Sequence, residues 1–338
     1  MDFFITGTAG FIGFHLAKLL LEQGHSVHGY DGITDYYDVR LKHARHNLLR
    51  QYPQFTATEA LLEDDATLQS AVAAAKPRAI VHLAAQAGVR YSIEHPRSYI
   101  DANIIGSFNV MEAARRQQVA HLLMASTSSV YGANADMPFD ENQKCDTQMS
   151  FYAATKKAGE AMSHAWAHIH GVPTTQFRFF TVYGPWGRPD MALFKFTKAI
   201  LAGQPIDIYN HGDMWRDFTY VEDLVRAIAL LVDAVPPAAQ DRDPAQAIEG
   251  DSLSPVAPWR VVNIGNSDKV RLLDFIDAIE QSLGQKAIRN HLPIQPGDVP
   301  ATWADTRLLQ RLTGYKPATG VQQGVQAFVR WYREHHRL

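Results

Sequence analysis

The sequence has little of what marks several large classes of protein. Cys145 is the only cysteine in 338 residues, which excludes a disulfide framework and a cysteine-based metal site and fits a reducing cytoplasm. The net charge of −3 lacks the basic excess of a nucleic-acid-binding surface. No uncharged run of 18 residues could span a bilayer, and no basic segment precedes an apolar leader. We therefore expect a soluble cytoplasmic protein without nucleic-acid or membrane partners.

The 15 histidines do not predict a metal site. His164 and His168 are four residues apart in "HAWAH", which would place both imidazoles on one face of a helix. The segment lacks the glutamate of a zinc-protease helix, and no cysteine or acidic cluster nearby offers a third ligand. We expect no bound metal.

Apolar β-rich segments alternate with helical segments in the first half of the chain, which is typical of a parallel sheet covered on both faces. Helices are predicted over 11–23, 97–118 and 150–170. Beyond "FFTVYGPWGRPD" the elements are shorter and Gly and Pro more frequent, so a smaller second region is expected; 236–258 is predicted to be a surface loop. The predicted strands are 2–6, 26–31, 79–84, 121–126 and 174–180.

A glycine-rich turn follows the first predicted strand. "TGTAGFIG" places Gly7, Gly10 and Gly13 three residues apart, where the strand ends and the first helix begins. Glycine lets the backbone turn there and lets a pyrophosphate approach the N–H groups of the helix N-terminus. Asp31 ends the second strand, would bind ribose hydroxyls and would repel a 2′-phosphate, and no Arg or Lys follows before Arg40. The pattern predicts a dinucleotide site for NAD rather than NADP.

Two polar segments, 82–90 and 126–132, follow predicted strands, so they lie at the carboxyl edge of the sheet where ligands bind in this architecture. Tyr152 and Lys156 are one helical turn apart in "FYAATKK". A lysine ammonium and a positive nicotinamide ring would stabilise the tyrosine anion, so we expect the pKa of Tyr152 to fall from about 10 toward neutrality. The phenolate would then accept a proton from a substrate hydroxyl while the same carbon loses hydride to NAD, with Thr127 hydrogen-bonded to the phenol.

Several motifs together resemble one family. The chain is similar to the extended short-chain dehydrogenase/reductases, and most closely to UDP-glucuronate 4-epimerases, over nearly its whole length. The Tyr-x-x-x-Lys pair and the glycine loop are shared by the whole superfamily, whereas the stretch beginning "TVYGPWGRPDMA" is much narrower. The motifs that carry the resemblance are "TGTAGFIG", "HLAAQAGVR", "STSSVYG", "YAATK", "RFFTVYGPWGRPDMALFKFTKAIL", "MWRDFTYV", "NIGNS" and "QPGDVPATWAD".

The resemblance implies an α/β fold: a Rossmann-type doubly wound parallel sheet with a smaller α/β C-terminal substrate domain. The first, NAD-binding domain would comprise residues 1–180 and the second, which binds the nucleotide sugar, 181–338, with the chain crossing back to the first around 215–265. The resemblance also implies a homodimer formed by a four-helix bundle of the helices at 97–118 and 150–170.

The resemblance implies NAD as the cofactor and a catalytic triad of Thr127, Tyr152 and Lys156. Lys156 would also hold the nicotinamide ribose. The other implied cofactor contacts are Gly7, Gly10, Phe11, Ile12, Gly13, Asp31, Leu83, Ala84, Ala85 and Asn103.

The implied substrate is a UDP-hexuronate. Arg216 of "WRDF" would bind the diphosphate through its guanidinium fork, or alternatively form an ion pair with Asp217. Asp298 of "PGD" would contact the uridine ribose. Gln295 is a further implied substrate contact.

Small hydroxyl residues favour an acidic sugar. Ser128, Ser129 and Thr181 would hold the substrate carboxylate with its C–C bond out of line with the π system of a C4 ketone, where decarboxylation is slow. Thr181 stands where galactose-type 4-epimerases carry Asn. Arg90 and Arg188 are candidates for the carboxylate's charge, although either could instead form a surface or interdomain ion pair.

The same serines bear on the reaction. Related decarboxylases carry Glu at the position of Ser129, and 4,6-dehydratases carry Asp-Glu at Ser128 and Ser129. Because neither acid is present, we expect the 4-keto sugar to turn over and take the hydride back on its other face, converting UDP-glucuronate into UDP-galacturonate for polysaccharide biosynthesis. A C4-oxidising decarboxylase and a neutral-sugar epimerase stay open, as does a non-catalytic NAD sensor, although such sensors usually lose the Tyr-Lys pair.

Two departures from the family pattern concern the adenosine end of the cofactor. Gly32 follows Asp31 where close relatives usually have Asn. Leu61 stands where an acidic residue commonly reaches the adenine, unless Asp64 or Asp65 takes that role. These departures leave cofactor identity and chemistry unchanged but make cofactor affinity harder to predict.

Overall fold

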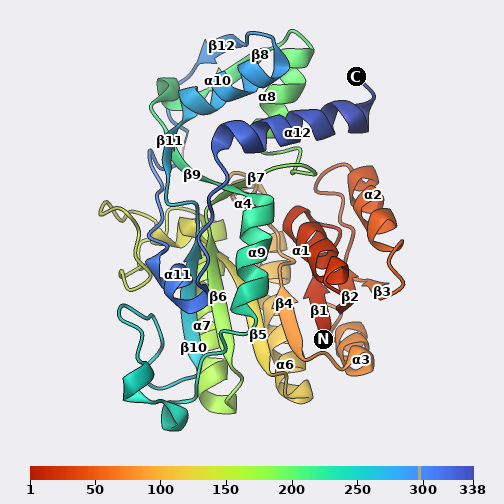
Figure 1. Ribbon diagram of the computed structural model, residues 1–338, viewed down its shortest axis with the longest axis vertical. Helices are drawn as coiled ribbons and strands as arrows, with labels where there is room; N and C mark the ends of the chain where they lie inside the picture. The colour runs from red at the N-terminus through yellow and green to blue at the C-terminus, as the bar shows by residue number, and fades with distance from the viewer. Residues whose placement is uncertain (296–297) are drawn as a thin grey trace.

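A seven-stranded parallel sheet forms the larger part of the molecule (Figure 1). The computed structural model describes residues 1–295 and 298–338. The strand order is β10-β6-β5-β4-β1-β2-β3, so the direction of winding reverses between β1 and β4, and every neighbouring pair is parallel. This is the predicted doubly wound α/β fold. The strands are β1 (Asp2–Thr6), β2 (Ser26–Asp31), β3 (Phe55–Glu59), β4 (Ala79–His82), β5 (His121–Thr127), β6 (Thr174–Phe179) and β10 (Trp259–Ile264).

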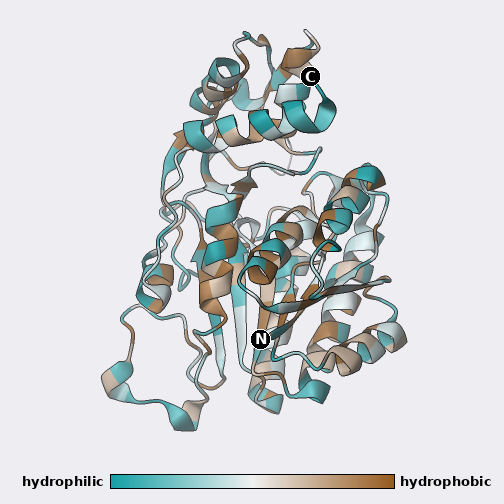
Figure 2. Ribbon diagram, turned by 45° about the vertical axis from the view of Figure 1, so that its right-hand side comes forward, coloured by the Kyte–Doolittle hydropathy of each residue, from teal (hydrophilic) through white to brown (hydrophobic). Residues whose placement is uncertain are grey.

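Helices cover both faces of this sheet, and successive strand residues pack to opposite sides. Phe3 and Ile5 of β1 belong to a core with α1, α9 and α11, whereas Phe4 faces a second core with α3 and α6. Hydrophobic and hydrophilic residues alternate along the flanking helices in Figure 2. The helices of this region are α1 (Phe11–Glu22), α2 (Val39–Leu49), α3 (Asp65–Ala75), α4 (Tyr91–Glu94), α5 (Pro96–Tyr99), α6 (Ser107–Gln117), α7 (Phe151–His170), α9 (Val221–Leu231) and α11 (Arg307–Thr313).

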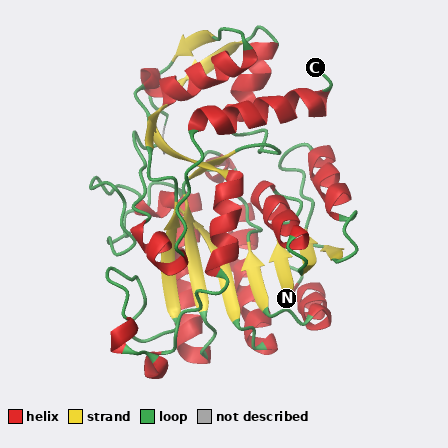
Figure 3. Cartoon of the chain, in the orientation of Figure 1, coloured by secondary structure: helices red, strands yellow, loops and turns green. Residues whose placement is uncertain are grey.

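A smaller region lies beyond the carboxyl ends of the parallel strands, toward which the strand arrows point in Figure 3. It contains a three-stranded sheet, β11-β9-β7, a two-stranded sheet, β12-β8, and its own hydrophobic core. Its strands and helices are β7 (Thr181–Tyr183), β8 (Pro205–Ile208), β9 (Trp215–Tyr220), β11 (Lys269–Arg271), β12 (Ile288–His291), α8 (Ala192–Leu201), α10 (Leu272–Leu283) and α12 (Val321–His336).

The chain passes between the two regions more than once. It enters the smaller region at β7, and after β9 it returns: α9 packs beside α1 and β10 pairs with β6 at the sheet edge. Residues 221–264 therefore pack with the larger region, and 269–291 with the smaller. The division into domains at residue 180 stays a prediction.

Three local features differ from the sequence prediction. Strand β3 was missed because, as an edge strand, it buries only Phe55 fully, and β10 because it follows a long loop. The predicted helix over 97–118 is interrupted by a π-helical segment, η1 (Ile100–Gly106). Residues 236–258 contain only two short 3₁₀ turns. No helix in the described ranges is long and apolar enough to cross a membrane.

Candidate active site

The glycine loop leaves room for nothing but backbone. Gly7 has φ +83°, and its N–H donates to the Tyr30 carbonyl at 2.7 Å. A Cβ on Gly13 would lie 2.1 Å from the Gly7 carbonyl oxygen, and one on Gly7 would lie 2.8 Å from the Ala84 nitrogen. Gly10 precedes α1 without a side-chain cap, so the first N–H groups of the helix are open to an anion. The loop lies against Leu83 and Ala84 and leaves the start of α1 open, an arrangement that would fit a pyrophosphate.

Asp31 is fixed by the backbone around it. Its two carboxylate oxygens each accept a hydrogen bond of 2.9 Å, from the N–H groups of Ala9 and Ile33. Sequence reasoning missed two buried cations of α2, Lys42 and Arg45, which lie close enough to Asp31 for its charge to raise their pKa values, although burial lowers both overall. The Asp31 carboxylate therefore lies near positive charge that the local sequence does not reveal.

The two departures from the family pattern lie in contact with each other. A Cβ added to Gly32 would lie 2.6 Å from a Leu61 methyl carbon. Asp64 is the N-cap of α3 and accepts a hydrogen bond from Thr67, while Asp65 accepts one from Gln69. Both carboxylates are thus engaged within α3.

Asn103 lies in the π-helical segment and ties three elements together. Its amide donates to the Gln86 carbonyl and to the Thr155 hydroxyl, both at 3.0 Å, and its oxygen accepts from the Gln86 N–H at 2.9 Å. Residues after β4 are thereby held against α7. The expected cofactor contacts Ala85 and Ile12 are half-buried.

The triad residues come from the end of β5 and the start of α7. Ser150 caps α7 by accepting a hydrogen bond from Ala153, and Lys156 donates to the Ala125 carbonyl at 2.8 Å. Burial lowers the pKa of Lys156 to about 8. Burial also raises the pKa of Tyr152, opposed by a hydrogen bond with Thr127 and by the charge of Arg188.

The direction of the tyrosine shift corrects one expectation for the protein alone. We expected a lowered pKa from Lys156 and the nicotinamide ring together. The side chains by themselves leave the phenol protonated because desolvation outweighs the charge of Arg188. The expected lowering by Lys156 and the nicotinamide ring together stays a prediction for the cofactor-bound protein.

A polar pocket opens beside the triad. Its interior volume is about 160 Å³. It brings together predicted substrate contacts from distant segments: Ser128, Ser129, Thr181, Arg216 and Asp298. Sequence reasoning named none of the other lining residues, although five of them lie within motifs that it quoted. These residues are Val89, Tyr131, Gly132, Phe139, Met149, Ser150, Val299 and Thr302.

Arg216 lines this pocket, and no carboxylate of the described residues is bonded to it. Its guanidinium donates to the carbonyls of Trp215 at 2.9 Å and Pro300 at 3.2 Å. Burial lowers its pKa, opposed by the charge of Asp298. The alternative ion pair with Asp217 is wrong, because Asp217 is buried and accepts backbone N–H groups of the turn after β10 instead.

The two arginines considered for the substrate carboxylate both form ion pairs. Arg90 binds Asp298 at 3.1 Å, which links the two regions of the molecule. Arg188 donates to Asp190 at 3.0 Å, and the partner charge holds its pKa above the ordinary value despite burial. Gln295 accepts a hydrogen bond from the Asp298 N–H at 3.2 Å through its carbonyl.

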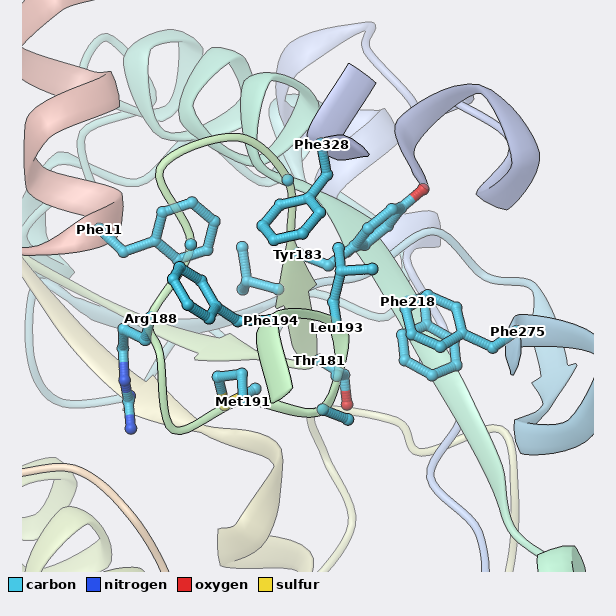
Figure 4. A pocket seen from close by; sticks show the side chains of 14 residues that line it. Phe11, Thr181, Tyr183, Arg188, Met191, Leu193, Phe194, Phe218, Phe275 and Phe328 are labelled. Carbon is cyan, nitrogen blue, oxygen red and sulfur yellow. The ribbon is translucent and has the colours of Figure 1, made fainter. Parts of the chain in front are cut away.

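An apolar pocket adjoins the polar one (Figure 4). Phe11 of the glycine loop approaches Phe194 and Phe328 of the smaller region there. Thr181 lines both pockets. The cofactor loop and the substrate region therefore meet through aromatic side chains.

Comparison with known proteins agrees with this geometry. The model of the NAD dependent epimerase/dehydratase family matches residues 3–242. The chain belongs to this family. A probable UDP-glucuronate 4-epimerase of Rhizobium meliloti (strain 1021) is 54% identical over 338 residues, covering 100% of this chain and 98% of the relative. UDP-glucuronate 4-epimerase 4 of Arabidopsis thaliana is 43% identical, covering 98% of this chain and 75% of that protein.

Solved structures of the family share the whole fold. The UDP-glucuronic acid 4-epimerase from Bacillus cereus, solved with UDP-glucuronic acid and NAD, superposes with a TM-score of 0.85 at 29% identity, covering 99% of this chain and 100% of that one. MoeE5 in complex with UDP-glucose and NAD has a TM-score of 0.82 at 29% identity, covering 99% and 100%. The family confirms the Rossmann-type fold and the NAD-dependent class of enzyme predicted from the motifs.

Proposed function

We propose that this protein interconverts UDP-glucuronate and UDP-galacturonate by NAD-dependent epimerisation at C4. The observation that carries the proposal is the composition of the polar pocket. Hydroxyl side chains lie beside the triad, and within the described lining the one carboxylate, Asp298, is at the Arg216 end. No acidic residue of that lining stands beside the reacting carbon to drive elimination.

The glycine loop, Asp31 and Asn103 are proposed to hold the cofactor. Open N–H groups at the start of α1 suit its pyrophosphate, and Asp31 suits the adenosine ribose. Leu83, Ala84 and Ala85 would form the wall behind it, with Phe11 and Ile12 on the other side. NAD supplies the hydride acceptor and later returns the hydride.

Tyr152 is proposed to take the proton from the C4 hydroxyl and to return it after the sugar has turned. Thr127 would hydrogen-bond the phenol and the sugar. Lys156, anchored to the Ala125 carbonyl, would bind the nicotinamide ribose and stabilise the phenolate. The raised pKa of Tyr152 in the protein alone implies that proton transfer waits for the cofactor.

Ser128, Ser129 and Thr181 are proposed to bind the substrate carboxylate. Hydroxyl hydrogen bonds would hold its C–C bond near the plane of the C4 ketone, away from the π system into which carbon dioxide loss would release electrons. Arg188, paired with Asp190, lines the adjoining apolar pocket, which Thr181 also lines. A hexuronate would thereby pass through the ketone without decarboxylation.

The diphosphate is proposed to bind Arg216. A guanidinium has five N–H donors, and the two carbonyl bonds of Arg216 leave others for phosphate oxygens. Asp298 would accept from the uridine ribose while paired with Arg90, and Gln295 would be a neighbouring contact.

Proton NMR of the purified protein with UDP-glucuronate, with and without added NAD, tests this function. The expected result is UDP-galacturonate with neither a pentose nor bicarbonate. A UDP-pentose would establish a decarboxylase, and turnover of UDP-glucose alone a neutral-sugar epimerase. An unchanged spectrum for every sugar with NAD bound would favour the non-catalytic sensor.

We also propose a homodimer that acts in the cytoplasm. Ile105 and Phe108 are exposed beside α7, which exposes Ile169, and Phe108 packs edge-on to Trp166 at 5.5 Å. Such a contiguous apolar surface favours a helix-bundle interface. The variant I105E/F108E should be monomeric by light scattering, whereas I288E, at an exposed position in β12, should keep the wild-type mass. A wild-type monomer would contradict the dimer.

A further inference from the structure

A buried ion pair lies directly behind the triad. Arg178 of β6 binds Glu160 of α7 through two parallel hydrogen bonds of 2.9 Å, with side chains 3% and 1% exposed. Burial alone would raise the pKa of Glu160, but Arg178 holds it below the ordinary value. Buried pairs of this kind contribute little net stability compared with apolar residues of similar size. Stability alone therefore does not account for the pair.

The pair connects the two elements that carry the triad. Glu160 lies one turn beyond Lys156 and accepts a hydrogen bond of 2.7 Å from the Ser126 hydroxyl. Ser126 is the register partner of Arg178 across β5 and β6, and it immediately precedes Thr127. Together with the bond from Lys156 to the Ala125 carbonyl, α7 is joined to β5 at two successive residues.

Arg178 also supports the wall of the polar pocket. Its guanidinium carbon lies 4.7 Å from the ring centre of Tyr131, which lines the pocket after Ser128 and Ser129. The Tyr131 hydroxyl donates to Asn263 at 2.8 Å, fixing the far edge of the ring. A movement of Arg178 would therefore reach the turn that carries the proposed carboxylate-binding serines.

We propose that Glu160 and Arg178 are positioning residues for catalysis, which set the placement of Thr127 relative to Tyr152 and Lys156. Neither residue lines either pocket. The inference rests on the proposed function, because it assigns the pair to the same triad. Displacements of about 1 Å at reacting groups reduce rates up to about 100-fold. Loss of the ion pair that fixes α7 against β5 could therefore reduce kcat strongly.

A second pair provides a matched control. Arg260 of β10 binds Asp251 through two parallel hydrogen bonds of 3.0 and 2.8 Å, with side chains 5% and 11% exposed. The register partner of Arg260 is Thr175, near the beginning of β6 and away from the triad. The two pairs therefore share chemistry and burial but differ in position.

The test compares the neutral double variants E160Q/R178M and D251N/R260M. Glutamine keeps an acceptor for Ser126, and the two buried charges are removed together. Lys157, which also donates to Glu160 at 3.1 Å, is 33% exposed and keeps access to solvent. Both variants should therefore fold with melting temperatures within about 5 °C of the wild type. For E160Q/R178M, kcat should fall about 10- to 100-fold with the KM for UDP-glucuronate within threefold. For D251N/R260M, kcat should stay within twofold. R178K should lie between the wild type and E160Q/R178M, because lysine lacks the two-pronged geometry.

Equal kcat values for the two folded double variants would overturn the inference. A change in the KM for UDP-glucuronate with kcat unchanged would also overturn it. A second readout needs no substrate: the titration of Tyr152 in the NAD-loaded protein, measured by ultraviolet difference against Y152F. E160Q/R178M should shift this titration by more than about half a unit and D251N/R260M should not. If the wild type were inactive but E160Q/R178M shifted the Tyr152 titration, the proposed function would be rejected and the positioning role kept. If E160Q/R178M left the Tyr152 titration unchanged, the positioning role itself would be rejected.

Discussion

The cofactor edge and the substrate pocket are built in opposite ways. The cofactor edge is formed by a short stretch of chain, in which the glycine loop and Asp31 are fixed by backbone hydrogen bonds to their neighbours. The polar pocket gathers Ser129, Thr181, Arg216 and Asp298 from segments far apart in sequence. The first region can change little without losing the fold, whereas the second depends on how the smaller region meets the larger.

The triad lies between these regions. Tyr152→Phe should remove the chemistry while leaving the binding of cofactor and substrate intact. Without the phenol hydroxyl, proton transfer is lost, so kcat should fall about 100- to 10,000-fold. NAD content and UDP affinity should stay at wild-type values, because no binding contact is removed. Turnover measured by NMR reports the loss of chemistry, and the nucleotide content of the purified protein reports whether NAD is still bound. Wild-type turnover in Y152F would show that another group moves the proton.

The triad should show a pH signature of its own through Lys156. Its pKa is lowered to about 8 in the folded, NAD-free protein, so between about pH 8 and 10 the unfolded chain binds more protons than the folded one. Unfolding free energy should therefore rise with pH over this window, by up to about 3 kcal/mol relative to Lys156→Met. Chemical denaturation of both proteins at several pH values measures it. If the unfolding free energies of the wild type and Lys156→Met changed with pH in parallel, the result would contradict the lowered pKa of Lys156.

The substrate pocket should be weakened alone by Arg216→Met. Loss of charge-assisted bonds to a phosphate should raise the KM for UDP-glucuronate about 10- to 100-fold and weaken UDP binding equally, with NAD affinity unchanged. Arg242→Met is the control, because Arg242 also donates to a carbonyl, that of Ala257, but lies far from the pocket. Equal UDP affinity in both variants would remove Arg216 from the site.

The smallest expected effect concerns the contact between Gly32 and Leu61. Gly32→Asn should weaken NAD binding a few-fold, because its Cβ would meet Leu61 at 2.6 Å. G32N/L61D should recover the loss, giving a coupling of about 0.5–3 kcal/mol in a double-mutant cycle of NAD affinity. Additive effects would show that the two departures are independent.

How well each part could be predicted follows from the same comparison. The sheet, the glycine loop and the triad were predicted because periodicity and spacing are local. Strand β10 was missed because it follows a long loop, and the π-helical segment at 100–106 because it depends on packing partners. Residue type suggested Arg216, but only the structure separates it from Asp217. Lys42 and Arg45 carry no motif, so nothing in the sequence indicated their positions near Asp31.

The most direct test of the account is the fate of the hydrogen at C4. UDP-glucuronate deuterated at C4 would be incubated with the NAD-loaded protein, and the product analysed by mass spectrometry and NMR. Oxidation and return of the same hydride predicts UDP-galacturonate that retains deuterium at C4. Loss of the label to solvent, or release of carbon dioxide with a pentose product, would contradict the account.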